Sequence, residues 1–176
     1  MAEYYVNTTA IKEFCPRFKA GDRVFLSGEV LTARDAAHKR LFELLDAGKP
    51  LPFDIKGAVI YYAGPTPAPK GLAIGSCGPT TSARMDVYTP ELLRLGLAAT
   101  IGKGERSREV CNAIAEHGSV YLCAIGGAGA LAAKHITKSE VIAFDDLGCE
   151  SVKRLTFDNF PLIVGIDASG GNIFKV

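Results

Sequence analysis

The sequence predicts an α/β protein consisting of a single domain with a mixed β-sheet. Segments with helix start and stop signals alternate with short apolar runs, which favours parallel strands connected by helices. Other apolar segments are separated only by turn residues, which favours antiparallel pairing within the same sheet. The 176 residues suffice for one domain that needs neither a disulfide nor a metal for stability.

The first half of the chain contains one clear helix between apolar segments. GDRVFLSGEVLTA, residues 21–33, is predicted to form two strands around Ser27-Gly28. The segment ARDAAHKRLFELLDAG follows, with its apolar residues on one helical face, and Thr32 or Asp35 could cap this helix. GAVIYYAG is expected to form a buried strand. PTPAPKG is expected to form an extended loop, because proline restricts the backbone.

The second half alternates helices and strands and ends in antiparallel strands. YTPELLRLGL predicts a helix with Thr89 as its N-cap and Pro90 at its first position. LAATIG is a predicted strand, and Ser107 is expected to begin the helix REVCNAIAEHG. Four further strands are predicted, the last ending at a Ser-Gly-Gly-Asn turn: VYLCAIGG, VIAFDDLG, VKRLTFD and PLIVGID.

Composition argues against several classes of protein. The net charge is +1 and acidic residues interrupt the largest basic cluster, at 103–108, so no nucleic-acid partner is expected. Nothing in the sequence is typical of a membrane span or a signal peptide, which predicts a cytoplasmic location. The five cysteines are odd in number and lack CxxC spacing. They predict a reducing compartment and no metal site formed by this chain alone.

GSCGPTTSARMD, residues 75–86, is the first candidate site. Pro79 is compatible with entry into a helix, and the hydroxyls after it could cap a helix start that attracts anions. If that turn is helical, Thr80 and Arg84 share a face, and the guanidinium could hold a carboxylate through two parallel bonds. The same pattern also fits a capped helix with an arginine facing solvent.

LTARDAAH, residues 31–38, is the second candidate. Arg34 lies where a strand passes into a helix, a place where side chains converge on a ligand. His38 is a possible acid–base group. The alternative interpretation is a surface pair of Arg34 with Asp35 and a structural histidine.

IGGAGALAA, residues 125–133, resembles a dinucleotide-binding fingerprint. Gly127 and Gly129 precede Ala132, and Asp146 follows about 20 residues later. However, the residues after Asp146 carry hairpin strands and no second nucleotide-binding half, and small residues also allow close packing. A protein binding an NAD-type dinucleotide through 127–132 is one alternative function, and a non-catalytic module for a small anion is another.

Several motifs occur together in order along nearly the whole chain. They are GDRVFLSGEVLTARDAAH, IYYAGPTP, GSCGPTTSARMD, IGKG, YLCAIGGAGAL and LTFDNFPLIVGIDASGGNIF. Together they resemble the β subunit, equivalently the C-terminal domain, of iron–sulfur class I fumarate hydratases and L-tartrate dehydratases. The resemblance implies a swivelling β/β/α domain over residues 1–176 and a hydro-lyase that hydrates fumarate to malate or dehydrates tartrate.

The resemblance also implies a cofactor and a partner. In that family a [4Fe-4S] cluster is held by three cysteines of the α subunit, and its fourth iron acts as a Lewis acid on the substrate. No cysteine of this chain is implied as a ligand, so the chain alone is expected to be inactive. The expected assembly is a heterotetramer of two α and two β subunits.

Four residues match family positions that contact the dicarboxylate: Arg34, Thr80, Arg84 and Lys103. A dianion in a closed site needs such cationic partners. Thr80 is also the candidate within this chain for removing the C3 proton, although a hydroxyl is a poor base without help from its neighbours. A carboxylate or histidine of the partner is the alternative. His38 and Asp86 are expected to hold the helix and the loop in place.

Overall fold

Seven strands form one mixed sheet in the computed structural model, which describes residues 1–125, 127 and 129–175. The strands are β1 (Glu3–Asn7), β2 (Arg23–Thr32), β3 (Val59–Tyr61), β4 (Ala99–Gly102), β5 (Val120–Cys123), β6 (Ile136–Ala143) and β7 (Val152–Ile166). The α-helices are α1 (Ile11–Phe14), α2 (Asp35–Asp46), α3 (Thr89–Arg94), α4 (Arg108–Glu116) and α5 (Gly129–Ala133). Short 3₁₀ helices are η1 (Thr8–Ala10), η2 (Ser82–Met85) and η3 (Asp145–Glu150). The single α/β domain with a mixed sheet is confirmed.

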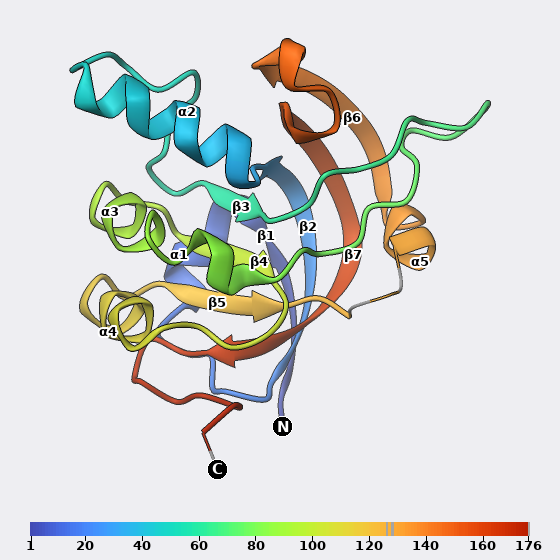
Figure 1. Ribbon diagram of the computed structural model, residues 1–176. Helices are drawn as coiled ribbons and strands as arrows, with labels where there is room; N and C mark the ends of the chain where they lie inside the picture. Colours follow the sequence, from blue (N-terminus) through green and yellow to red (C-terminus); the bar gives the residue numbers. More distant parts are fainter. Residues whose placement is uncertain (126, 128, 176) are drawn as a thin grey trace.

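The sheet closes on itself (Figure 1). β2, β3, β4 and β5 pair in parallel, in that order. β7 is antiparallel to both β5 and β2, so it joins the two ends of this parallel set into a ring. β1 extends the sheet beside β2, and β6 extends it beside β7.

Two apolar cores lie on the two faces of the ring. Inside it, Leu26, Tyr61 and Leu122 pack with aromatic residues of β7. On its outer face, Ile60 and Tyr121 pack under α2, α3 and α4, which lie together on one side of the sheet in Figure 1. Adjacent residues of β3 and β5 therefore point into different cores, which explains why these strands are continuously apolar.

The helices form where their start signals predict, but only one predicted cap is confirmed. The Ser107 hydroxyl accepts a hydrogen bond from Val110 N–H at 3.3 Å and begins α4 as predicted. The capping assignment of Thr32 and Asp35 is wrong, because Arg34 is the N-cap of α2 and makes no side-chain cap. Thr32 instead donates to Ser151 O at 3.3 Å, linking β2 to the start of β7.

Thr89 also differs from its predicted role. Tyr88 occupies the N-cap position of α3, and Thr89 is the first helical residue. Its buried hydroxyl donates to Met85 O at 2.9 Å, which satisfies the group inside the protein.

The two predicted hairpins around Ser27-Gly28 and after VKRLTFD are wrong. β2 runs without a break through Ser27 and Gly28, with a bulge between Leu26 and Gly28. β7 likewise continues through Asn159. Gly28 (φ +107°) and Asn159 (φ +47°) bend the paired strands at one place, where Asn159 N–H donates to Ser27 Oγ at 2.9 Å.

Two further boundaries differ from the sequence-based expectation. β6 begins at Ile136, so VIAFDDLG contributes only the end of that strand, and its acidic residues lie in η3. β1 was not predicted. Among the described residues no helix is both long and apolar enough to cross a membrane.

Candidate functional site

The carboxyl ends of β2, β3, β4 and β5 lie at one edge of the ring, because these strands are parallel. Arg34 follows β2, Gly64 follows β3 and Lys103 follows β4. Ligands of α/β proteins commonly bind at the edge where parallel strands end. The segments that the sequence singled out therefore meet at the position where a site is expected.

The loop of residues 76–82 crosses this edge and is hydrogen-bonded to the ends of two strands and to the first residue of α5. Cys77 N–H donates to Gly129 O at 3.0 Å, beyond β5. Thr80 N–H donates to Tyr62 O at 2.7 Å, and Ser82 N–H donates to Lys103 O at 3.0 Å. The loop is thus fixed by backbone contacts that leave the Thr80 side chain available for a ligand.

Gly102 is required where this loop lies directly on β4. A Cβ atom built there would come within 1.9 Å of Ser82 Oγ and 2.9 Å of the Tyr62 ring. Ser82 Oγ is hydrogen-bonded to Tyr121 OH at 2.9 Å, so it cannot move aside freely. The small residue allows loop and strand to approach closely.

Arg84 extends from η2 and is oriented by a carboxylate from another helix. Its Nε donates to Asp35 Oδ1 at 3.0 Å and its Nη2 donates to Asp35 Oδ2 at 2.7 Å. Its Nη1 lies 3.4 Å from Thr80 Oγ1, and the side chain is 51% exposed. The predicted proximity of Thr80 and Arg84 is present. The predicted hydroxyl cap is wrong, because Thr81 is the N-cap of η2 and makes no side-chain cap.

Arg34 lies at the same edge, and its buried Nε makes no hydrogen bond within the described part of the chain. Its Nη1 would come within 2.8 Å of a Cβ on Gly64, so the guanidinium lies against the backbone after β3. Its Nε is 3.4 Å from Glu150 Oε1, yet this buried nitrogen makes no hydrogen bond among the described residues. The alternative pairing of Arg34 with Asp35 is wrong, because Asp35 binds Arg84.

Lys103 lies at the same edge and is held there by backbone contacts with the 76–82 loop. It forms a parallel bridge with Thr81, and its side chain is partly buried. Arg34, Thr80, Arg84 and Lys103 therefore come from segments that backbone and side-chain contacts bring together.

Asp86 is fixed by Arg106, a residue that the sequence analysis did not single out. The Arg106 side chain is fully buried and its Nε donates to Asp86 Oδ1 at 2.7 Å. The guanidinium lies over the rings of Tyr62 and Tyr121, 5.3 Å and 4.9 Å from their centroids. Asp86 also accepts from Ser107 N–H, so it joins the end of η2 to the start of α4. Arg106 lies in the charged segment 103–108, whose composition is typical of an exposed surface, so nothing in the sequence indicates that its side chain is buried.

His38 supports the backbone of Arg34. Its Nδ1 lies 2.9 Å from Arg34 O, and its ring stacks on Tyr88 with 5.4 Å between centroids. Burial lowers the pKa of His38 to about 4, so the imidazole is neutral near pH 7. This geometry supports a positioning role.

Comparison with known proteins shows which family this chain belongs to. The family model described as Fumarase C-terminus matches residues 2–176. The chain belongs to this family. Fumarate hydratase 2 of Leishmania major is 38% identical over 187 residues, covering 98% of this chain and 33% of that protein. Fumarate hydratase class I, anaerobic, of Escherichia coli is 41% identical over 162 residues, covering 90% of this chain and 29% of that protein.

One relative matches this member of the fumarase C-terminus family over almost the full length of both proteins. The putative L(+)-tartrate dehydratase subunit beta of Methanocaldococcus jannaschii is 38% identical over 179 residues, covering 98% of this chain and 91% of that protein. The chain spans about a third of the fumarate hydratases above. The resemblance to a β subunit or C-terminal domain is thereby confirmed.

Two cysteines of this family member, Cys15 and Cys77, are poorly suited to bind an iron–sulfur cluster. Cluster ligands are thiolates, whereas burial raises the pKa of Cys15 to about 11 and that of Cys77 to about 12. Both side chains are completely buried in the inner core. Within the described residues, no three histidine, cysteine or acidic side chains are grouped to hold a metal ion.

The glycine motif does not have the topology of a dinucleotide-binding unit. Positions 126 and 128 lie outside the described residues. α5 has five residues, and β6 pairs with β7 rather than in parallel with β5. Asp146, expected to bind a ribose, is held by Arg40 at 2.7 Å and 2.9 Å. In this chain Gly129 instead allows the 76–82 loop to approach, since its Cβ would come within 2.2 Å of Ser76 Oγ.

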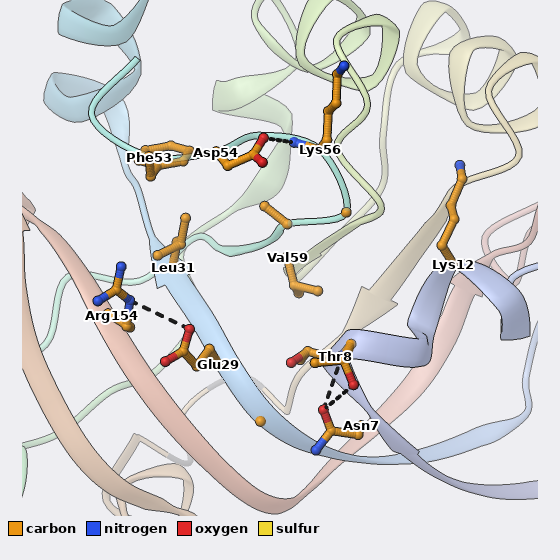
Figure 2. A pocket seen from close by; sticks show the side chains of 14 residues that line it. Asn7, Thr8, Lys12, Glu29, Leu31, Phe53, Asp54, Lys56, Val59 and Arg154 are labelled. Carbon is orange, nitrogen blue, oxygen red and sulfur yellow. Dashed lines mark hydrogen bonds and ion pairs between the residues drawn. The ribbon is translucent and has the colours of Figure 1, made fainter. Parts of the chain in front are cut away.

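A cavity of about 700 Å³ lies beside β2, away from the predicted site (Figure 2). The cavity lies between the end of β1 and the start of β3, and Glu29 and Val59 contribute to its wall. Arg154 is paired with Glu29 at 3.7 Å, and Lys12 donates to His117 O at 2.6 Å. The cationic groups in Figure 2 do not converge on one point, so cavity size does not identify an anion site here.

Proposed function

We propose that this chain is the β subunit of a hydro-lyase that adds water to a four-carbon dicarboxylate, hydrating fumarate reversibly to malate. The main support for this proposal is the Arg84 guanidinium, which Asp35 holds beside Thr80. Arg34 and Lys103 lie at the same edge of the sheet. Dehydration of tartrate is the second candidate, because the relative covered over 91% of its length is named a tartrate dehydratase subunit.

Arg84 would bind one substrate carboxylate with the end of its guanidinium. Arginine carries five N–H donors; Asp35 takes one on Nε and one on Nη2. The remaining N–H groups on Nη1 and Nη2 can still hold a carboxylate through two parallel bonds. Asp35 thus fixes the orientation of Arg84 without occupying the face that the substrate would use.

Arg34 and Lys103 would neutralise the rest of the dianion. The Arg34 Nε supports this assignment, because it is buried and makes no hydrogen bond to the residues that the structure describes, although Glu150 lies 3.4 Å away. A buried donor is costly until a ligand completes its hydrogen bond. Held between these groups, the substrate would keep its reacting bond in a fixed orientation. The same cations would stabilise negative charge that spreads onto a carboxylate as the C3 proton leaves.

Thr80 is the candidate within this chain for removing that proton. Arg84 Nη1 lies 3.4 Å from its hydroxyl, and a neighbouring positive charge favours the deprotonated form of a hydroxyl. A carboxylate or histidine of the partner is the alternative base. The [4Fe-4S] cluster would be held by an α subunit, in a cytoplasmic heterotetramer of two α and two β subunits.

The test is anaerobic co-expression of this chain with the cluster-bearing α subunit from the same genome. Fumarate hydration and tartrate dehydration are measured with and without this chain. We expect activity only when both chains are present, and the preferred substrate then distinguishes the two candidates. A stable complex without either activity would contradict the hydro-lyase proposal. Thermal protection of this chain by NAD would support the dinucleotide alternative instead.

A further inference from the structure

An apolar strip runs over the surface of the protein from β1 to α5. It consists of Tyr5 on β1, Phe25 on β2, Ile163 on β7, and Ile125 and Leu131 beyond β5. Tyr5 is 68% exposed, Ile125 61%, Leu131 50% and Ile163 40%. Large contiguous apolar surface is uncommon on proteins that have no partner.

The members of the apolar strip are contiguous. Tyr5 pairs with Phe25 across the β1–β2 register, and their rings stack with 4.8 Å between centroids. Phe25, Ile163 and Ile125 line one depression of about 280 Å³. Ile125 and Leu131 line the next depression, together with Pro161, which contributes to both. The strip therefore continues from β1 over β2 and β7 to α5, through two adjoining depressions that also include Arg23 and His135 in their walls.

One end of the apolar strip reaches the candidate site. Leu131 lies in α5, whose first residue Gly129 accepts the hydrogen bond from Cys77 in the 76–82 loop. That loop carries Thr80 and leads to Arg84. A protein that covers the strip would therefore come to lie beside the predicted substrate-binding groups.

We infer that the apolar strip is the surface on which the cluster-bearing α subunit docks, an inference that rests on the proposed function. The chain matches a C-terminal family model and spans about a third of the fumarate hydratases. The description of the family as a fumarase C-terminus indicates that the remaining two-thirds of those relatives precede the matched segment, which begins beside β1, the strand that carries Tyr5. Under the proposed function a separate α subunit would take the place of those preceding residues and would cover the strip.

The edge of the apolar strip has the composition of an interface rim. Arg23, which lines the depression around Phe25, is paired with Glu3 at 3.2 Å, and both side chains are about half exposed. Apolar and aromatic residues at the centre with charged residues at the margin are typical of protein–protein interfaces.

The test measures the affinity of this chain for the α subunit, anaerobically, by sedimentation velocity over a concentration series. Tyr5→Ser, Ile125→Ser and Ile163→Ser each remove an exposed apolar side chain. Val141→Ser is the matched control, because Val141 is 44% exposed on β6, outside the strip. We expect each strip variant to weaken binding at least tenfold with an unchanged melting temperature, and the control to bind as the unaltered chain does.

Other outcomes would overturn the inference in distinguishable ways. Normal α-subunit binding by all three strip variants in an active complex would exclude the strip as the docking surface while the proposed function stands. Self-association of the unaltered chain that only the strip variants lose, with α binding intact, would assign the strip to a second copy. Lost α binding in strip variants of a complex that hydrates neither substrate would keep the surface and reject the proposed function.

Discussion

Arg84 owes its orientation to Asp35, a carboxylate far from it in the sequence. We expect Arg84→Ala in the assembled enzyme to cost about 2–5 kcal/mol of transition-state stabilisation, the range for breaking a buried charge pair. Arg84→Lys should also lower kcat/KM. Lysine lacks the planar fork of arginine, so it cannot bind Asp35 and a substrate carboxylate through paired hydrogen bonds at the same time. The measurement is kcat/KM for fumarate.

Arg94 provides the matched control for this prediction. It forms the same two-bond pair with a carboxylate, Glu91, and is 61% exposed on α3. Arg94→Ala should leave kcat/KM unchanged. If Arg84→Lys were as active as the unaltered enzyme, charge alone would matter and the oriented fork would have no role.

His38 makes the stability of the folded chain depend on pH. Its pKa is lowered by burial to about 4 in the folded state and lies near 6.5 in an unfolded chain. Between these values only the unfolded state binds the proton. The neutral, buried His38 therefore makes its full contribution to the free energy of unfolding above about pH 6.5. As the pH falls toward 4, proton uptake by the unfolded chain lowers that free energy by up to about 3 kcal/mol.

The measurement is the free energy of unfolding in urea at several pH values between 7.5 and about 4.5. His38→Gln cannot take up the proton, so its stability should fall less over this range than that of the unaltered chain. His135→Gln, at a partly exposed histidine, should keep the original slope. Parallel profiles for the unaltered chain and His38→Gln would contradict a neutral, buried imidazole.

Among the elements, η2 and α4 are joined by the buried pair of Asp86 and Arg106. Arg106→Met should destabilise the chain by about 3–5 kcal/mol, because it leaves the Asp86 carboxylate buried without its partner. Replacing both residues by apolar ones should cost less than the sum of the single changes, since no charge is then stranded. Urea unfolding measures both effects.

Arg40→Met is the control for this pair. Arg40 binds Asp146 through two hydrogen bonds of similar length, but that pair is exposed, so its loss should not change the unfolding midpoint detectably. Additive losses in the double variant would show that Asp86 and Arg106 do not act as a pair.

The pairing of β2 with β7 explains why two elements were mispredicted. Gly28 and Asn159 both adopt positive φ, and turn prediction depends on the residue types that tolerate this conformation. A bulge inside a long strand requires the same residue types. Local sequence cannot distinguish the two, because only the partner strand determines whether the chain reverses or bends.

Across the molecule, the sequence predicted contacts within motifs better than contacts between them. The spacing of Thr80 and Arg84 predicted their proximity, and the motif order led to the family. The Asp35–Arg84 and Asp86–Arg106 pairs were missed because each joins segments far apart in sequence. Closure of the ring was also missed, since it depends on β7 pairing with two strands at once.

Closure of the ring predicts how protection from hydrogen exchange is distributed. β4 is buried over its whole length and pairs with β3 and β5, whereas β6 pairs with β7 alone in the described part of the chain. Many β6 residues are exposed. Opening β4 requires disrupting both cores, so its amides should exchange only through global unfolding, while those of β6 exchange through local opening.

Native-state hydrogen exchange with increasing urea separates these two routes. We expect the opening free energy of Thr100 and Ile101 amides in β4 to equal the global free energy of unfolding and to fall with the same urea dependence. Amides of β6 should show a smaller opening free energy and little urea dependence, because local opening exposes little surface. Equal protection in β4 and β6 would show that β6 is as integral to the closed ring as the parallel strands, and would contradict its assignment as an extension of the sheet.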